Sequence, residues 1–146
     1  MASHRSRAIS WGIALLLGSA APAAAVPQIA PTMPAAVSLM QLGGAPILVS
    51  TATGMTLYVN AKDPPGVSTC LAKPQSKRGP LCSDLWPPLE AVSGDTTIGA
   101  YTVIKRDDGT LQWAYRDKPL YLFAKDQVPL DTLGDGIEKT WHIARP

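Results

Sequence analysis

The chain has 146 residues, of which 46% are hydrophobic and 16% are charged, and its 13 lysines and arginines nearly balance its 11 aspartates and glutamates. Affinity for nucleic-acid phosphates comes from clustered cations, and no basic run is longer than Lys77-Arg78, so the sequence argues against nucleic acid as a partner. A chain of this length has room for one domain, which buries about two thirds of the surface that its unfolded form exposes.

The first 25 residues have the pattern of a cleaved secretory signal. Arg5 and Arg7 form a basic start, residues 8–20 form an apolar stretch, and residues 23–25 offer the small side chains that signal peptidases require. We expect residues 1–25 to be a signal peptide and cleavage to follow Ala25. The mature protein is then expected in the periplasm or secreted from the cell.

Loss of this signal leaves a formally neutral chain, because Arg5 and Arg7 account for the excess of basic residues. No later apolar run approaches the ~20 residues that span a bilayer, so no transmembrane segment is expected after signal cleavage. No cysteine lies at the expected cleavage site, so no lipid anchor is expected either.

Residues 26–36 are rich in alanine and proline and carry little charge, which favours extended backbone and predicts a tether. Residues 37–146 are expected to form a single β domain. Their short apolar segments are separated by turn residues and lack a helical period over about eleven positions. The predicted fold class is therefore all-β, with about six or seven strands.

Two hairpins are predicted from their turns. Residues 47–51 and 55–60 flank a three-residue connection that ends in Gly54, where a left-handed backbone is needed. Residues 101–106 and 110–115 flank Asp107-Asp108-Gly109, and Asp-Gly is a strong hairpin signal. Further strands are expected at residues 37–42, 119–123 and 140–144.

Alternation along a strand predicts which side chains share a face, because neighbours point to opposite sides of the sheet. Four sets of side chains are each expected to form the inward face of a two-layer β structure: Leu111, Trp113 and Tyr115; Met55, Leu57 and Val59; Leu120 and Leu122; and Trp141 and Ile143. The opposite face of their strands is expected to carry Tyr58 and Asn60, and likewise Tyr121 and Phe123. Exposed aromatic rings can bind ligands or partner proteins while the backbone stays rigid. The candidates for such contact are Tyr58, Tyr101 and Tyr121.

Cys70 and Cys82 are the two cysteines of a chain that is expected to leave the cytoplasm, so they are predicted to form a disulfide. Closing a loop of this size contributes about 3 kcal/mol on the chain-entropy estimate. The alternative is a redox-active or metal-binding pair. The sequence offers no Cys-x-x-Cys for such a pair, and His142 is the only histidine of the mature chain.

One heptad occurs twice in the chain. Residues 57–63 (LYVNAKD) recur as residues 120–126 (LYLFAKD), with five of seven positions identical, and each copy is followed by a loop and then a tryptophan, Trp86 or Trp141. The repeat predicts two duplicated β units, at about residues 47–90 and 101–146. These units are expected to pack face to face as a small two-layer sandwich or barrel-like domain.

The second copy, YLFAKD, matches the motif Yx(FWY)xxD in full, whereas the first copy, YVNAKD, has Asn60 in place of the aromatic residue. The chain thereby resembles a bacterial family of secreted repeats, described as predicted lipoproteins with this motif. The function of that family is not established. The resemblance extends over most of residues 47–144.

The motif also has a physical interpretation of its own. The aspartate follows the end of its strand, where its carboxylate can accept hydrogen bonds from loop amides or from a tryptophan N–H and fasten the strand to its exit loop. The alternative is that the tyrosines and aspartates of both copies converge on a ligand. The residues concerned are Tyr58, Asp63, Trp86, Tyr121, Phe123, Asp126 and Trp141.

His142 is a weak candidate for a site, because it is the only mature side chain whose ordinary pKa lies near neutrality. Its place in a strand favours packing or hydrogen bonding over catalysis. Asp126, Asp131 and Asp135 could supply oxygen ligands to a hard cation, but their spacing fits no known calcium loop. We predict no catalytic residue, no metal and no cofactor.

The sequence therefore favours an extracytoplasmic β domain that binds an unknown envelope protein or a small ligand. The alternative is a metal-linked or redox accessory protein of the periplasm, and an enzyme is less favoured.

Overall fold

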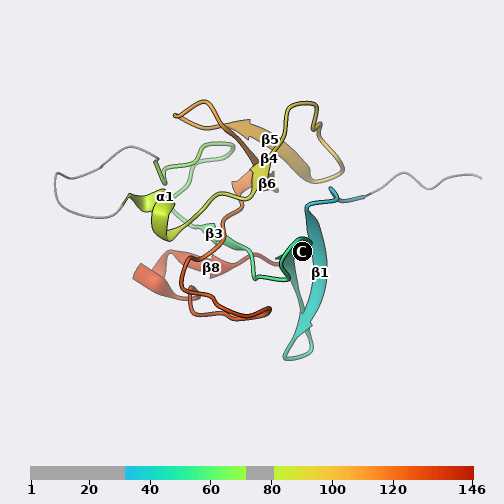
Figure 1. Ribbon diagram of the computed structural model, residues 1–146, viewed down its shortest axis with the longest axis vertical. Coiled ribbons are helices and arrows are strands. Elements are labelled where there is room, and N and C mark those ends of the chain that lie inside the picture. Colours follow the sequence, from blue (N-terminus) through green and yellow to red (C-terminus); the bar gives the residue numbers. More distant parts are fainter. Residues whose placement is uncertain (1–31, 72–80) are drawn as a thin grey trace, which may run out of the picture.

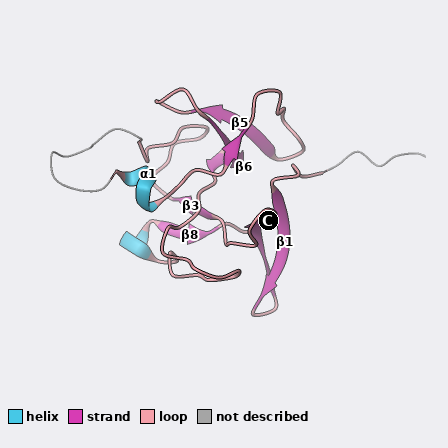
Figure 2. Cartoon of the chain, viewed as in Figure 1, coloured by secondary structure: helices cyan, strands magenta, loops and turns pink. Residues whose placement is uncertain are grey.

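The computed structural model describes residues 32–71 and 81–146. The predicted signal peptide and most of the predicted tether lie outside these residues. The described part confirms the all-β fold class and contains antiparallel strands with very short helices (Figures 1 and 2). The elements are β1 (Val37–Leu42), β2 (Ala45–Ser50), β3 (Tyr58–Asn60), α1 (Cys82–Leu85), β4 (Glu90–Ala91), β5 (Tyr101–Lys105), β6 (Leu111–Tyr115), β7 (Lys118–Pro119), the 3-10 turn η1 (Ile137–Lys139) and β8 (Trp141–Ile143).

Within residues 32–71 and 81–146, the strands form three small antiparallel sheets that do not close into a barrel. β1 pairs with β2, β3 pairs with β8, and the order β4-β6-β5 forms a third sheet in which β7 also pairs with β6. Figure 1 shows this third sheet above the β3–β8 pair, with β1 standing to one side. None of the helices in the described residues is long and apolar enough to cross a membrane.

Glycines with positive φ form the turns that define the hairpins. The predicted hairpin of β5 and β6 is present, with Tyr101 opposite Tyr115 and Gly109 at φ 89° in its turn. Gly54, at φ 71°, ends the turn after β2, and the chain then pairs back through Thr56 opposite Val49. These positions favour glycine because a side chain disfavours left-handed backbone.

A central four-segment arrangement places the two motif copies side by side. Tyr58 of the first copy pairs on one side with Ile143 of β8 and on the other with Tyr121 of the second copy. Tyr121 in turn pairs with Pro88. Each motif strand is therefore flanked by the other motif strand and by the segment that follows the other copy. This mirrored order implies an approximate two-fold relation between the copies.

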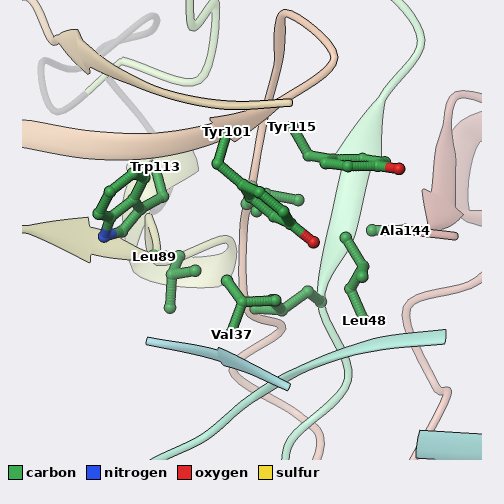
Figure 3. Close-up of a cluster of buried hydrophobic side chains, with 9 residues drawn as sticks. Val37, Leu48, Leu89, Tyr101, Trp113, Tyr115 and Ala144 are labelled. Atoms are coloured by element: carbon green, nitrogen blue, oxygen red, sulfur yellow. The ribbon is translucent and has the colours of Figure 1, made fainter. Parts of the chain in front are cut away.

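Both faces of this arrangement are buried, so the expectation of a single inward face is wrong. One face, which carries Leu57 and Leu120, packs in a cluster with Trp113 and with the paired rings of Tyr101 and Tyr115 at the open end of the β5–β6 hairpin (Figure 3). The opposite face contributes Tyr58 and Tyr121 to a second cluster. The sheets are small, and two separate apolar clusters bury both sides of the central strands.

Candidate functional site

The motif tyrosines and aspartates are bonded across the two copies. Tyr58 donates a hydrogen bond to Oδ2 of Asp126 over 2.7 Å, and Tyr121 donates one to Oδ2 of Asp63 over 2.6 Å. The aspartate of each copy thus holds the tyrosine of the other copy. The sequence interpretation, in which each aspartate fastens its strand to its own exit loop, did not include this bond to the other copy.

The second oxygen of each aspartate binds the loop that follows its own copy. Oδ1 of Asp63 accepts hydrogen bonds from the backbone N–H and the hydroxyl of Thr69. Oδ1 of Asp126 accepts one from the backbone N–H of Leu133 over 3.0 Å. Each carboxylate therefore joins its own exit loop to the strand of the other copy.

The tryptophans after the two copies stack on each other between the motif tyrosines. The ring centroids of Trp86 and Trp141 lie 3.7 Å apart with planes at 4°. The edge contacts mirror one another, because Tyr58 meets Trp86 at 5.5 Å and Tyr121 meets Trp141 at 5.0 Å. A Cβ at Gly134 would lie 2.9 Å from both Tyr58 and Trp86, so glycine allows the chain to pass close to these rings.

The third motif position breaks the mirrored arrangement. Phe123 of the second copy packs on Trp86 with ring centroids 4.4 Å apart. Asn60 of the first copy stands opposite Trp141 in the β3–β8 register but has no ring to pack on it. Oδ1 of Asn60 accepts a hydrogen bond from the backbone N–H of Lys62 over 3.0 Å.

A cavity of about 360 Å³ lies at this position. Its volume is near the lower end of the roughly 300 to 1,000 Å³ that is usual for small-molecule sites. Its walls combine aromatic, disulfide and polar surface, and they include Asn60, Lys62, Cys70, Cys82, Trp86 and Trp141. The cavity therefore adjoins the motif residue that departs from the family pattern.

Cys70 and Cys82 form the predicted disulfide, with Cα atoms 5.2 Å apart. Cys70 is only 1% exposed and belongs to the cluster that contains both stacked tryptophans. The disulfide thus connects the loop after the first copy to α1 and forms part of the cavity wall.

Arg106 is a buried residue of this region that the sequence analysis missed. Its guanidinium donates to the backbone oxygen of Cys70, to Oε1 of Gln112 and to Oγ of Ser68. The same Ser68 oxygen lies 2.7 Å from the Tyr121 hydroxyl, so Arg106 is joined through it to the Tyr121–Asp63 bond. No sequence signal separates Arg106 from an ordinary solvated arginine at a strand end.

The three tyrosines proposed as exposed ligand contacts are all buried, so that interpretation is wrong. Tyr58 and Tyr121 are fully buried, and Tyr101 is 3% exposed in the apolar cluster below the β5–β6 hairpin (Figure 3). Burial raises the pKa of Tyr101 to about 12. These tyrosine rings therefore pack inside the two apolar clusters and leave little exposed area for a partner.

His142 is half-exposed, and its Nδ1 lies 4.0 Å from Oδ1 of Asp135. The same Asp135 oxygen accepts the backbone N–H of Ile143, and Oδ2 of Asp131 accepts the backbone N–H groups of Gln127 and Val128. These bonds use the carboxylates of Asp131 and Asp135 to hold the loop backbone. No group of three metal-ligating side chains occurs within residues 32–71 and 81–146.

The two tyrosine–aspartate bonds differ in their electrostatic surroundings. Burial raises the pKa of Asp126 above its ordinary value, although bonds from Tyr58 and Leu133 oppose the shift. Burial, assisted by the bond to Asp126, also raises the pKa of Tyr58. The pKa of Tyr121 is raised by burial and by Asp63, and Arg106 partly offsets the effect.

We expect Asp126 to make the protein less stable as the pH rises. Its ordinary pKa is 3.8, and its folded-state pKa is higher, so the folded protein holds a proton that the unfolded chain has released within this window. The contribution to the free energy of unfolding is therefore present below the ordinary pKa and is lost as the pH rises through the folded-state pKa. Urea unfolding at several pH values from about pH 4 upward measures the free energy of unfolding. This free energy should fall more steeply with rising pH for the native protein than for Asp126→Asn. Equal pH slopes for the two proteins would contradict the assignment.

A family model described as a secreted repeat of unknown function matches residues 102–145. No curated protein and no solved structure matches the chain. The matched residues contain the second motif copy, Trp141 and the strands β6, β7 and β8. The resemblance seen in the YLFAKD segment is confirmed, because residues 102–145 match the model of this family of secreted repeats of unknown function.

Proposed function

We propose that this protein is a small-molecule binding module of the cell envelope, exported by its signal peptide and acting at the cavity beside Asn60. The family match supports an extracytoplasmic location. The single observation that carries the proposal is the cavity of about 360 Å³ at the motif position where an aromatic residue is replaced by asparagine.

The rigidity of the surrounding structure supports binding at this place. The disulfide, the stacked tryptophans and the exchanged tyrosine–aspartate bonds hold the cavity walls from several directions. A preformed site loses little conformational freedom when a ligand enters, which favours binding. The walls also offer both apolar rings and polar groups, the usual combination in small-molecule sites.

The proposal is tested by comparing the native protein with Asn60→Phe, which supplies the aromatic residue that the motif has in the second copy. Ligand-observed NMR with a library of neutral, anionic and cationic one-ring compounds should find compounds that bind the native protein and lose binding to the variant. Val128→Ala changes an exposed side chain away from the cavity and serves as the control. If no compound distinguishes the native protein from Asn60→Phe, the cavity is not a binding site.

A further inference from the structure

The mirrored contacts of the two copies show what is missing beside Trp141. In the second copy, Phe123 packs on Trp86, and Trp86 stacks on Trp141, so three rings follow one another with centroid separations of 4.4 and 3.7 Å. The place that mirrors Phe123 belongs to Asn60. A fourth ring would continue the series at that place.

The cavity has room for such a ring. At about 360 Å³ it can hold a compound with one ring and a short polar part, whereas a folded partner protein needs a surface of a different scale. Stacked or edge contacts with the tryptophans would favour an aromatic ring over an aliphatic group of the same size.

The polar groups of the cavity determine what such a ring should carry. Within the described residues, Oδ1 of Asn60 accepts the N–H of Lys62, and no described side chain or carbonyl accepts from its Nδ2. Lys62 and Glu138 line the same cavity with opposite charges. Neither forms an ion pair with another residue in the described ranges. The cavity thus offers a cation, an amide donor and an anion around aromatic walls.

We propose that the cavity binds a free α-amino acid with an aromatic side chain. The ring lies beside Trp141, the carboxylate binds Lys62 and the Nδ2 of Asn60, and the ammonium group binds Glu138. This inference rests on the proposed function and specifies its ligand class. The end of a peptide carries only one of the two charges, so a peptide should bind less well than the free amino acid.

The test uses the purified exported protein and three probes that share one ring. L-phenylalanine carries both charges, N-acetyl-L-phenylalanine lacks the ammonium group, and L-phenylalaninamide lacks the carboxylate. The fluorescence of Trp86 and Trp141 in the cavity wall can follow their binding. L-phenylalanine should bind more tightly than either derivative by about threefold to fivefold, a modest factor because Lys62 is exposed to solvent.

Variants assign each charge to its residue. Lys62→Met should weaken the binding of L-phenylalanine by the same factor and leave the affinity for L-phenylalaninamide unchanged. Glu138→Gln should leave the affinity for N-acetyl-L-phenylalanine unchanged. Lys125→Met is the matched control, because Lys125 occupies the same motif position in the second copy and does not line the cavity. Asn60→Phe should remove binding of all three probes.

The outcomes separate the ligand class from the proposed function. Equal affinity for the three probes, or weakening by Lys125→Met equal to that by Lys62→Met, would overturn the amino-acid proposal. If the library contains other compounds that bind the native protein but not Asn60→Phe, the proposed function stands and only the ligand class is wrong. If L-phenylalanine and every library compound fail to bind, both are wrong.

Discussion

Replacing Trp86 by alanine is expected to lower the free energy of unfolding by about 3 to 5 kcal/mol, the usual cost of removing a buried aromatic side chain. Trp86 is 3% exposed and lies between the rings of Trp141 and Phe123, with Tyr58 at its edge. No single neighbour can move to fill the volume, because each of these rings is fixed by its own contacts on the central strands. Urea denaturation monitored by far-ultraviolet circular dichroism measures the loss.

The control for this prediction is Val92→Ala, which shortens an apolar side chain that is 67% exposed. Exposed substitutions of this kind usually stay within about 0.5 kcal/mol of the native stability. A cost for Trp86→Ala below about 1 kcal/mol would show that the stacked rings are not the centre of the second apolar cluster.

Asp63→Ala is the second change for which we expect a large effect, a loss of about 3 kcal/mol. The carboxylate is 2% exposed and accepts three hydrogen bonds, one from Tyr121 and two from Thr69. Without the carboxylate, Ser68 is the remaining hydrogen-bond partner of the Tyr121 hydroxyl, and the exit loop of the first copy loses its bonds to Asp63. Thermal unfolding followed by circular dichroism should show a fall in Tm of several degrees or more.

Asp126→Ala tests the same role in the second copy and should cost less, about 1 to 3 kcal/mol. Its carboxylate accepts two hydrogen bonds, and burial already opposes its ionisation. Asp107→Ala, in the exposed turn of the β5–β6 hairpin, is the control and should leave Tm nearly unchanged. A larger loss for Asp126→Ala than for Asp63→Ala would contradict the assigned roles.

The parts of the fold that depend on local sequence were predictable. The β5–β6 hairpin follows from Asp108-Gly109 and from the alternation on either side of it, and both signals lie within a few residues of the paired strands. The Cys70–Cys82 bridge was predictable for a similar reason, because two cysteines in an exported chain have one pairing.

The exchange between the motif copies was not predictable from the heptads alone. A repeat shows that Tyr58 is equivalent to Tyr121 and Asp63 to Asp126, but this equivalence holds whether each aspartate binds its own tyrosine or the other one. The pairing of Tyr58 with Tyr121 decides which aspartate each tyrosine reaches, and this pairing joins positions far apart in the chain.

The sequence indicated the candidate site only through a residue that departs from the motif. The motif pointed to Asn60 as a departure, but the cavity beside it depends on the disulfide, on η1 and on two tryptophans from different parts of the chain. The burial of Tyr58 and Tyr121 was missed because strict alternation assumes that one face of a sheet meets solvent. Here a second apolar cluster covers that face.

The exchange of partners between the two motif copies is tested most directly by double-mutant cycles on stability. Tyr58→Phe should couple with Asp126→Asn, and Tyr121→Phe with Asp63→Asn, each by about 0.5 to 3 kcal/mol, whereas Tyr58→Phe with Asp63→Asn should be additive within about 0.5 kcal/mol. Strong coupling of Tyr58 with Asp63 and of Tyr121 with Asp126, without coupling across the copies, would contradict the account.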